Sequence, residues 1–278
     1  MSVDFVESIK KGERFSFGKN WNSFLETLDD KRIEIAVESL KEMLEVEDLK
    51  KMKFLDIGSG SGLFSLAAKK LGAEVYSFDF DPDSVGCTKY LRDRYFPESD
   101  WIVEEGSALD VDYVKSLGQF DIVYSWGVLH HTGEMYKALE NAAIPVKDSG
   151  KLFIAIYNDE GAKSKIWKKL KRLYVKSTAG KYLTIMLYTP YYLLKNFLMD
   201  TFYLRQPPMR RYREFKKKRG MSWKHDLVDW LGGYPFEVAS IPVIFNFYKQ
   251  RGFNLNVVSA KKGKGCNQFV FTKGYPVK

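Results

Sequence analysis

Three glycines at alternate positions, Gly58, Gly60 and Gly62, follow a short apolar segment at 53–57 and open an amphipathic segment at 62–71. This order predicts a strand, a tight turn and a helix. Glycine has no Cβ, so the turn lets the backbone approach a ligand closely. The helix behind it presents unpaired N–H groups and a positive dipole end. The pattern predicts a site for a nucleotide-like cofactor, and an ordinary strand-to-helix turn without a ligand is the alternative.

Two carboxylates accompany the turn. Asp56 precedes it, and Asp79 ends a second apolar segment at 74–79. An acid about 20 residues after a glycine turn is placed to hydrogen-bond ribose hydroxyls. A nicotinamide dinucleotide fingerprint would have a third glycine where this chain has Leu63, which counts against a nicotinamide oxidoreductase.

Four segments in this order resemble the motifs of class I S-adenosylmethionine (SAM) methyltransferases. They are the glycine turn at 55–62, Asp79, the loop at 105–110 and the segment at 120–131. The resemblance covers roughly residues 50 to 157 and is strongest to the ubiquinone-biosynthesis branch, the polyprenyl-hydroxyphenol methylase-like enzymes. It implies an α/β fold with a doubly wound, mostly parallel, seven-stranded Rossmann-like sheet. It also implies SAM as cofactor, S-adenosyl-L-homocysteine as product, and no metal.

The resemblance also assigns roles to residues. Gly58 and Gly60 would let the backbone pass the amino-acid and ribose parts of the cofactor, and Asp79 would bind the ribose hydroxyls. Asp56 would bind the ammonium group or brace the turn. Trp126 would lie at the floor of the site, near the methionine moiety. The complete predicted cofactor set is Asp56, Gly58, Ser59, Gly60, Asp79, Phe80, Ser107, Ala108, Trp126 and Trp21.

A hydroxyl acceptor must lose its proton, and histidine titrates near neutrality. The chain has three histidines, His130, His131 and His225. We favour His131 as base or acceptor ligand, with hydrogen bonding to nearby backbone as the alternative. His225 lies in a segment dense in polar and aromatic residues, and Tyr157 at the end of the fifth strand would face the acceptor. The candidate catalytic residues are therefore His131, His130, His225 and Tyr157.

Apolar periodicity predicts the elements that position these residues. Strands are expected at 53–57, 74–79, 101–104, 120–126 and 151–157, with helices at 31–44, 62–71, 83–95 and 134–146. A last helix at 239–251 and an antiparallel pair at 253–258 and 268–272 complete the sheet. Ligands bind outside the carboxyl ends of strands in such sheets. We expect a helical flap at 1–48, a SAM-binding core at 49–160, a helical insertion at 161–238 and the closing elements at 239–278.

The insertion has an unusual charge. Residues 161–219 carry 17 Lys and Arg and two acids, whereas the whole chain has a net charge of +9. All of the basic excess therefore lies here. The segment also contains an uncharged run at 182–194 that is interrupted by Pro190 and is shorter than the ~20 residues of a membrane-spanning helix.

We favour a helical cap that seals the acceptor pocket or forms a homodimer contact. Peripheral membrane contact through 163–219 is the alternative, and nucleic acid fits less well because no RNA-binding motif is visible. Two distant cysteines and an N-terminus unlike a signal peptide favour a cytoplasmic protein, at most peripheral to the inner face of the membrane.

The sequence predicts a SAM-dependent methyltransferase whose acceptor is a hydroxyl on a small or lipid-linked metabolite, which the basic insertion suggests is anionic. The alternatives are an N-methyltransferase acting on an amine or peptide, and an RNA methyltransferase that uses the basic insertion. A nicotinamide oxidoreductase and a non-catalytic binding module fit less well.

Overall fold

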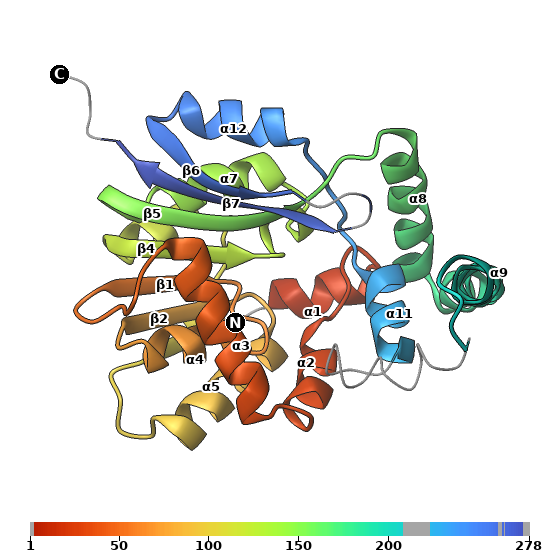
Figure 1. The fold of residues 1–278 in the computed structure, drawn as a ribbon, viewed down its shortest axis with the longest axis horizontal. Coiled ribbons are helices and arrows are strands. Elements are labelled where there is room, and N and C mark those ends of the chain that lie inside the picture. The colour runs from red at the N-terminus through yellow and green to blue at the C-terminus, as the bar shows by residue number, and fades with distance from the viewer. Residues whose placement is uncertain (1–2, 208–222, 261–262, 264, 275–278) are drawn as a thin grey trace.

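A computed structural model describes residues 3–207, 223–260, 263 and 265–274. Its centre is a seven-stranded sheet (Figure 1). The strands are β1 (Lys53–Ile57), β2 (Glu74–Asp79), β3 (Ile102–Glu105), β4 (Phe120–Trp126), β5 (Val146–Tyr157), β6 (Phe253–Ser259) and β7 (Cys266–Lys273). Their order is β3-β2-β1-β4-β5-β7-β6, and only β7 runs antiparallel to its neighbours. The predicted fold class is confirmed.

Most predicted strands lie within one or two residues of the observed ones, but β5 begins five residues early. Val146 already pairs with Phe120, and the regular register resumes at Lys151 after an irregularity. Lys147, Asp148 and Ser149 between them are polar and exposed, so apolar periodicity does not reveal this part of the strand. The preceding helix was predicted to reach 146 but ends at Ala143, because Pro145 cannot continue it.

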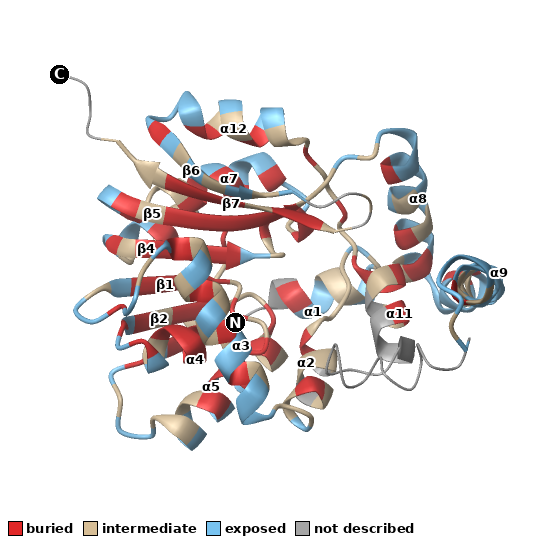
Figure 2. Ribbon diagram, viewed as in Figure 1, coloured by how far each residue is buried: buried red, intermediate tan, exposed pale blue. Residues whose placement is uncertain are grey.

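Helices cover both faces of the sheet. One face carries α3 (Asp30–Leu44), α4 (Leu63–Lys70) and α5 (Pro82–Tyr95). The other carries α6 (Val111–Ser116), α7 (Met135–Ala143) and α12 (Ile241–Lys249). Each layer buries an apolar cluster against the sheet, whose inner strands β1, β4 and β7 are mostly buried (Figure 2). This doubly wound arrangement leaves the strand ends to form the site.

The remaining helices gather together beyond the end of the sheet, to the right in Figure 1. They are α1 (Val3–Lys10), α2 (Gly18–Leu25), α8 (Ala162–Lys176), α9 (Thr178–Leu198) and α11 (Trp223–Gly232). A π-helical turn at Met199–Tyr203 follows α9. Pro190 lies inside α9 without ending it. Within the described residues, no helix combines the length and apolar character that crossing a bilayer requires. The basic run at 216–219 lies outside the described residues.

Candidate active site

A cavity of about 790 Å³ lies at the carboxyl ends of the strands. Its lining comes from the glycine turn, the ends of β2, β4 and β5, the N-terminal segment, and the insertion. The predicted residues in the lining are Asp56, Gly58, Ser59, Gly60, Asp79, Phe80, Ser107, Ala108, Trp126, Trp21, His131 and Tyr157. The volume is within the usual range for a cofactor or drug-sized ligand.

The glycine turn has a conformation and surroundings that require glycine. Gly58 has φ +78°, and a Cβ there would lie 2.4 Å from Cγ1 of Val128. Gly60 has φ +57°, and a Cβ there would lie 3.2 Å from Nε1 of Trp21. Glycine is therefore required at 58 and 60 by the positive φ and by close packing against Val128 and Trp21.

Asp79 holds the turn through its carboxylate. Oδ2 accepts a hydrogen bond from the Gly60 N–H at 2.9 Å, and Oδ1 accepts one from the Asp81 N–H at 2.8 Å. Burial raises the pKa of Asp79 to about 6, although the two N–H donors oppose the shift. Each carboxylate oxygen has a second acceptor position, so both can also accept hydrogen bonds from a diol.

Asp56 is 2% exposed and ends a buried polar chain beneath the turn. The Trp101 indole N–H donates to Ser77 Oγ at 2.9 Å, Ser77 and Ser65 share a 2.8 Å bond, and the Ser65 hydroxyl donates to Asp56 at 2.5 Å. Burial raises the pKa of Asp56 to about 7, and the Ser65 bond opposes that shift. These contacts match the bracing role, while the place of Asp56 in the lining leaves ammonium binding open. Sequence reasoning did not identify Ser65 or Trp101.

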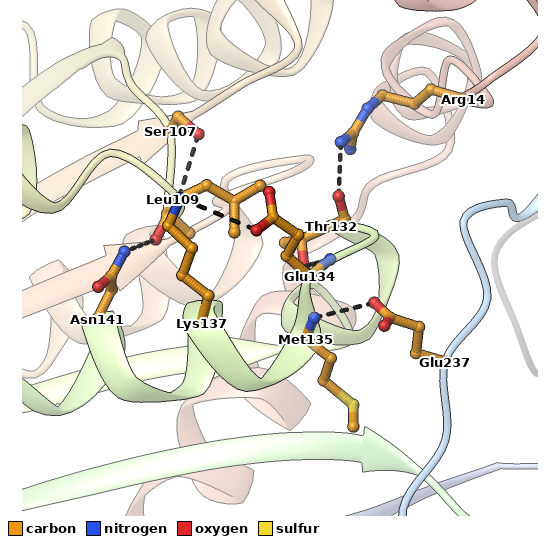
Figure 3. Close-up of polar contacts among 10 residues, drawn as sticks. Arg14, Ser107, Leu109, Thr132, Glu134, Met135, Lys137, Asn141 and Glu237 are labelled. Atoms are coloured by element: carbon orange, nitrogen blue, oxygen red, sulfur yellow. Dashed lines mark hydrogen bonds and ion pairs between the residues drawn. The ribbon is translucent and has the colours of Figure 1, made fainter.

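The N-terminal segment lies across the cavity and is tied to the core. The Gly18 N–H donates to Asp81 Oδ2 at 2.8 Å. Arg14 donates to the carbonyls of His131 at 3.1 Å and Thr132 at 3.2 Å, and its guanidinium lies 5.1 Å from the centre of the Phe80 ring (Figure 3 shows the Thr132 bond). The segment thus both packs on the domain and lines the cavity, as a flap would. Arg14 was not identified from sequence.

Ser107 and Ala108, two residues of the predicted cofactor set, lie in the lining just after β3. Ser107 Oγ accepts from the Leu109 N–H at 3.2 Å, and Asn141 of α7 donates to the Ala108 carbonyl at 2.8 Å (Figure 3). Trp126 differs from its expected place at the floor. It is 41% exposed and its indole donates to Gln268 at 3.2 Å, so it forms an open part of the lining.

His131 and His130 lie in a 3₁₀ turn after β4, and the structure distinguishes them. His131 is 8% exposed, belongs to the lining, and has Nδ1 2.6 Å from the Pro235 carbonyl. A carbonyl only accepts, so Nδ1 carries the proton and Nε2 has a free lone pair in the neutral ring. Burial lowers the pKa of His131 to about 3; the Pro235 bond opposes this, while Lys171 and Arg14 reinforce it.

His130 is fully buried and outside the lining, and its Nδ1 accepts from the Tyr157 N–H at 3.4 Å. Burial lowers its pKa well below the usual value. Its contacts are those of a structural residue. The Tyr157 ring packs 4.2 Å from the His130 ring and borders the cavity. His225 lies in α11, but its side chain is outside the described part of the structure.

The insertion contributes Tyr188, Tyr192, Leu227 and Trp230 to the lining. Their aromatic and apolar character makes this side of the cavity less polar than the glycine turn. The cavity therefore joins a polar end, suited to a nucleoside, to an aromatic end that the neutral imidazole of His131 borders.

Comparison with known proteins identifies a family, relatives and similar folds. The methyltransferase domain family matches residues 28–186. The chain is 27% identical over 110 residues to the ubiquinone biosynthesis O-methyltransferase of Pelagibacter ubique, covering 40% of this chain and 44% of that protein. It is 29% identical over 111 residues to the enzyme of the same name from Xanthomonas oryzae, covering 40% and 45%. The match therefore spans less than half the length of these relatives.

Among solved structures, the fold is similar to that of magnesium protoporphyrin IX methyltransferase from Synechocystis with bound S-adenosylhomocysteine. The TM-score is 0.54 at 12% identity, covering 92% of this chain and 95% of that one. The PKMT2 protein of Rickettsia typhi gives a TM-score of 0.55 at 13% identity, covering 85% and 52%. At these identities the likeness concerns the fold.

Proposed function

Because this chain belongs to the methyltransferase domain family and is a SAM-dependent methyltransferase, we propose that it transfers the methyl group to a hydroxyl oxygen. The acceptor would be a small or lipid-linked metabolite held at the aromatic end of the cavity. The observation that carries the proposal is the hydrogen bond between His131 Nδ1 and the Pro235 carbonyl.

The cavity fits the cofactor. Gly58 and Gly60 line the cavity with backbone alone, which suits close contact with a ligand, and Asp79 suits the ribose. When bound, SAM supplies a methyl group already activated by its sulfonium. The protein must orient the acceptor, exclude water and remove a proton. The N-terminal segment and the insertion enclose the cavity from two sides and so limit access of water.

Proton removal is the step that separates a hydroxyl from an amine, since a neutral amine attacks without losing its proton first. The Pro235 bond holds His131 in the tautomer whose Nε2 accepts a proton. The low pKa keeps this nitrogen unprotonated at neutral pH. An anionic acceptor beside the ring would raise the pKa and make it a stronger base. We therefore assign His131 as general base and Tyr157 as a neighbour that borders the acceptor.

The test uses methyl-labelled SAM, a metabolite extract of the source organism and mass spectrometry to identify the methylated product and atom. With that acceptor, His131→Ala should lower kcat by about 10²- to 10⁴-fold, the usual contribution of a general base. S-adenosylhomocysteine affinity should stay within about twofold. An acceptor analogue whose hydroxyl is already ionised should recover most of the lost rate. Label on nitrogen, or equal loss of affinity and rate, would contradict the assignment.

A lipid-linked acceptor is supported by the outer face of α9. Its apolar side chains include Met186, Leu187 and Leu194, which are 64%, 62% and 59% exposed. The described part of the insertion at 161–207 has a single acid, Asp200, and it is fully buried. Lys181 and Lys195 of the same helix are exposed. An apolar face with exposed lysines near it fits an anionic bilayer better than a neutral one. We propose that α9 lies on such a surface, from which the acceptor enters the cavity.

Vesicle flotation tests this contact. The protein should bind phosphatidylcholine vesicles that contain phosphatidylglycerol, and Leu187→Glu with Leu194→Glu should abolish binding. Ile35→Glu is the control, because Ile35 is 60% exposed on α3, far along the chain from the insertion. A homodimer in solution that the double variant dissociates, or selective binding to RNA, would replace the membrane as the partner of this face.

A further inference from the structure

A second cavity, of about 340 Å³, lies on the other side of the segment that carries Pro235. It shares no described lining residue with the methyl-transfer cavity. Three of its residues, Lys168, Arg172 and Lys176, are spaced four apart in α8 and therefore occupy one helix face on successive turns. Lys11 of the N-terminal turn adds a fourth positive charge.

The positive charge of this cavity is poorly neutralised. Lys168, Arg172 and Lys176 form no ion pair with any residue that the structure describes. Lys11 pairs with the exposed Glu7, at 3.1 Å. Like charges on one helix face repel one another, so the cavity would be stabilised by an anion.

Two acids border the cavity, and neither removes this excess. Glu13 is exposed. Glu237 is half-buried and its Oε2 accepts from the Met135 N–H at 3.1 Å (Figure 3). Burial raises the pKa of Glu237, while the Met135 bond and the charge of Lys168 oppose that shift. Tyr234 supplies the only other titratable side chain among the described residues of the lining.

The walls of the cavity are the segments that enclose the active site. Pro235 lines the second cavity while its carbonyl holds His131 of the first. The Tyr234 carbonyl accepts from the Phe15 N–H at 2.8 Å. The turn at Gly12 packs so closely on α8 that a Cβ there would lie 2.6 Å from the Val175 carbonyl. A ligand between these segments would fasten them together.

We propose that this second cavity is a binding site for a phosphate group, carried by a free metabolite or by a lipid head group. An arginine beside two lysines matches a phosphate dianion, since guanidinium binds two oxygens at once and ammonium groups supply further charge. The volume suits a small ligand. An occupant bridges α8, the N-terminal turn and the 234–237 segment, and so stabilises the enclosed form of the active site. The proposal is independent of which atom the enzyme methylates.

Isothermal titration with inorganic phosphate and with pyrophosphate, at constant ionic strength, tests the site. We expect saturable one-to-one binding by the wild type. Replacing Lys168, Arg172 and Lys176 together by Gln should weaken it at least about tenfold, because several charge-assisted hydrogen bonds are lost. The matched control replaces Lys163, Lys165 and Lys169 by Gln. It removes the same charge from exposed positions of α8 outside the lining and should bind phosphate within about twofold of wild type.

Two further measurements complete the test. Arg172→Lys keeps the charge but loses the two-pronged geometry, and should weaken phosphate binding several-fold while S-adenosylhomocysteine binding shows that the protein is folded. Phosphatidylcholine vesicles with and without phosphatidic acid distinguish the sources. Vesicle binding that free phosphate displaces, and that the Lys168, Arg172 and Lys176 variant loses, assigns the site to a head group. Phosphate binding together with vesicle binding that phosphate does not displace, as α9 alone would give, assigns the site to a free metabolite. Equal weakening of phosphate binding in both triple variants, or heats that follow ionic strength alone, would overturn the proposal.

Discussion

Replacing Asp79 by Asn should separate the structural and ligand-binding roles of this carboxylate. Its two oxygens accept from different backbone donors, Gly60 N–H on Oδ2 and Asp81 N–H on Oδ1. Asparagine has one carbonyl oxygen and one NH₂ group, so one of these N–H groups would face another donor. We expect a loss of about 1–3 kcal/mol in the free energy of unfolding, as for a buried unsatisfied donor. Urea denaturation measures it.

The same substitution should weaken binding of the cofactor. A ribose diol that donates to an ionised carboxylate contributes roughly 1.5–3 kcal/mol, because hydrogen bonds to a charged group are the stronger kind. Isothermal titration with S-adenosylhomocysteine at pH 8 should therefore show Kd about 10- to 150-fold higher in Asp79→Asn. In the wild type, affinity should fall as pH drops through about 6, where Asp79 becomes protonated. The variant should lack this step.

Asp110→Asn is the control for loss of a negative charge. Oδ1 of Asp110 alone accepts from the Asp112 and Tyr113 N–H groups, at 3.1 and 3.0 Å, so asparagine can keep both bonds. Asp110 is not part of the described cavity lining. If Asp79→Asn binds S-adenosylhomocysteine as tightly as Asp110→Asn does, the carboxylate does not hold the ribose and the reasoning is refuted.

Three further changes follow from the site. Gly58→Ala should lower the free energy of unfolding, measured in urea, by roughly 2–5 kcal/mol, because of the positive φ and the contact with Val128. Gly86→Ala is the control: Gly86 lies in α5 with open space around it, and the substitution should raise the free energy of unfolding by about 0.5–1 kcal/mol. Burial raises the pKa of Asp56 to about 7, above its unfolded value, so the wild type loses stability as pH rises from about 4 to 7. Asp56→Asn should remove this pH dependence and should be more stable than the wild type at pH 8. Urea denaturation at a series of pH values measures both effects. Burial lowers the pKa of His131 to about 3, so the acid limb of kcat/KM that belongs to this group should lie well below pH 6.5. A limb at 6.5 would show that the ring is more solvated than the structure indicates.

The glycine turn and its carboxylates could be predicted because the pattern is local. A short apolar strand, glycines that tolerate positive φ, and a helix of period 3.6 are all properties of neighbouring residues. Strand alternation with helices then implied the parallel sheet, and the sheet placed Asp79, Ser107 and Tyr157 at one edge. These expectations needed no knowledge of contacts between distant parts of the chain.

The contacts that define the chemistry were not accessible in this way. His131 meets Pro235 across 104 residues, and Arg14 reaches the His131 carbonyl across 117. The sequence places His130 and His131 next to each other and does not show which of them could act as the base. Packing shows that His131 lines the cavity and that His130 is fully buried. Likewise, Trp126 ends a predicted strand, but its exposure depends on how Gln268 of β7 comes alongside.

The sequence by itself determined the class of fold, the cofactor turn and the concentration of positive charge in the insertion, since each depends on residue type and short-range periodicity. Tertiary structure decided which imidazole meets the cavity, and that α9 turns Tyr188 inward and Leu187 outward. It also decided that Lys168, Arg172 and Lys176 border a separate hollow. The physical reason is that burial, tautomer and pKa depend on which distant segments pack together, and local periodicity places no constraint on that choice.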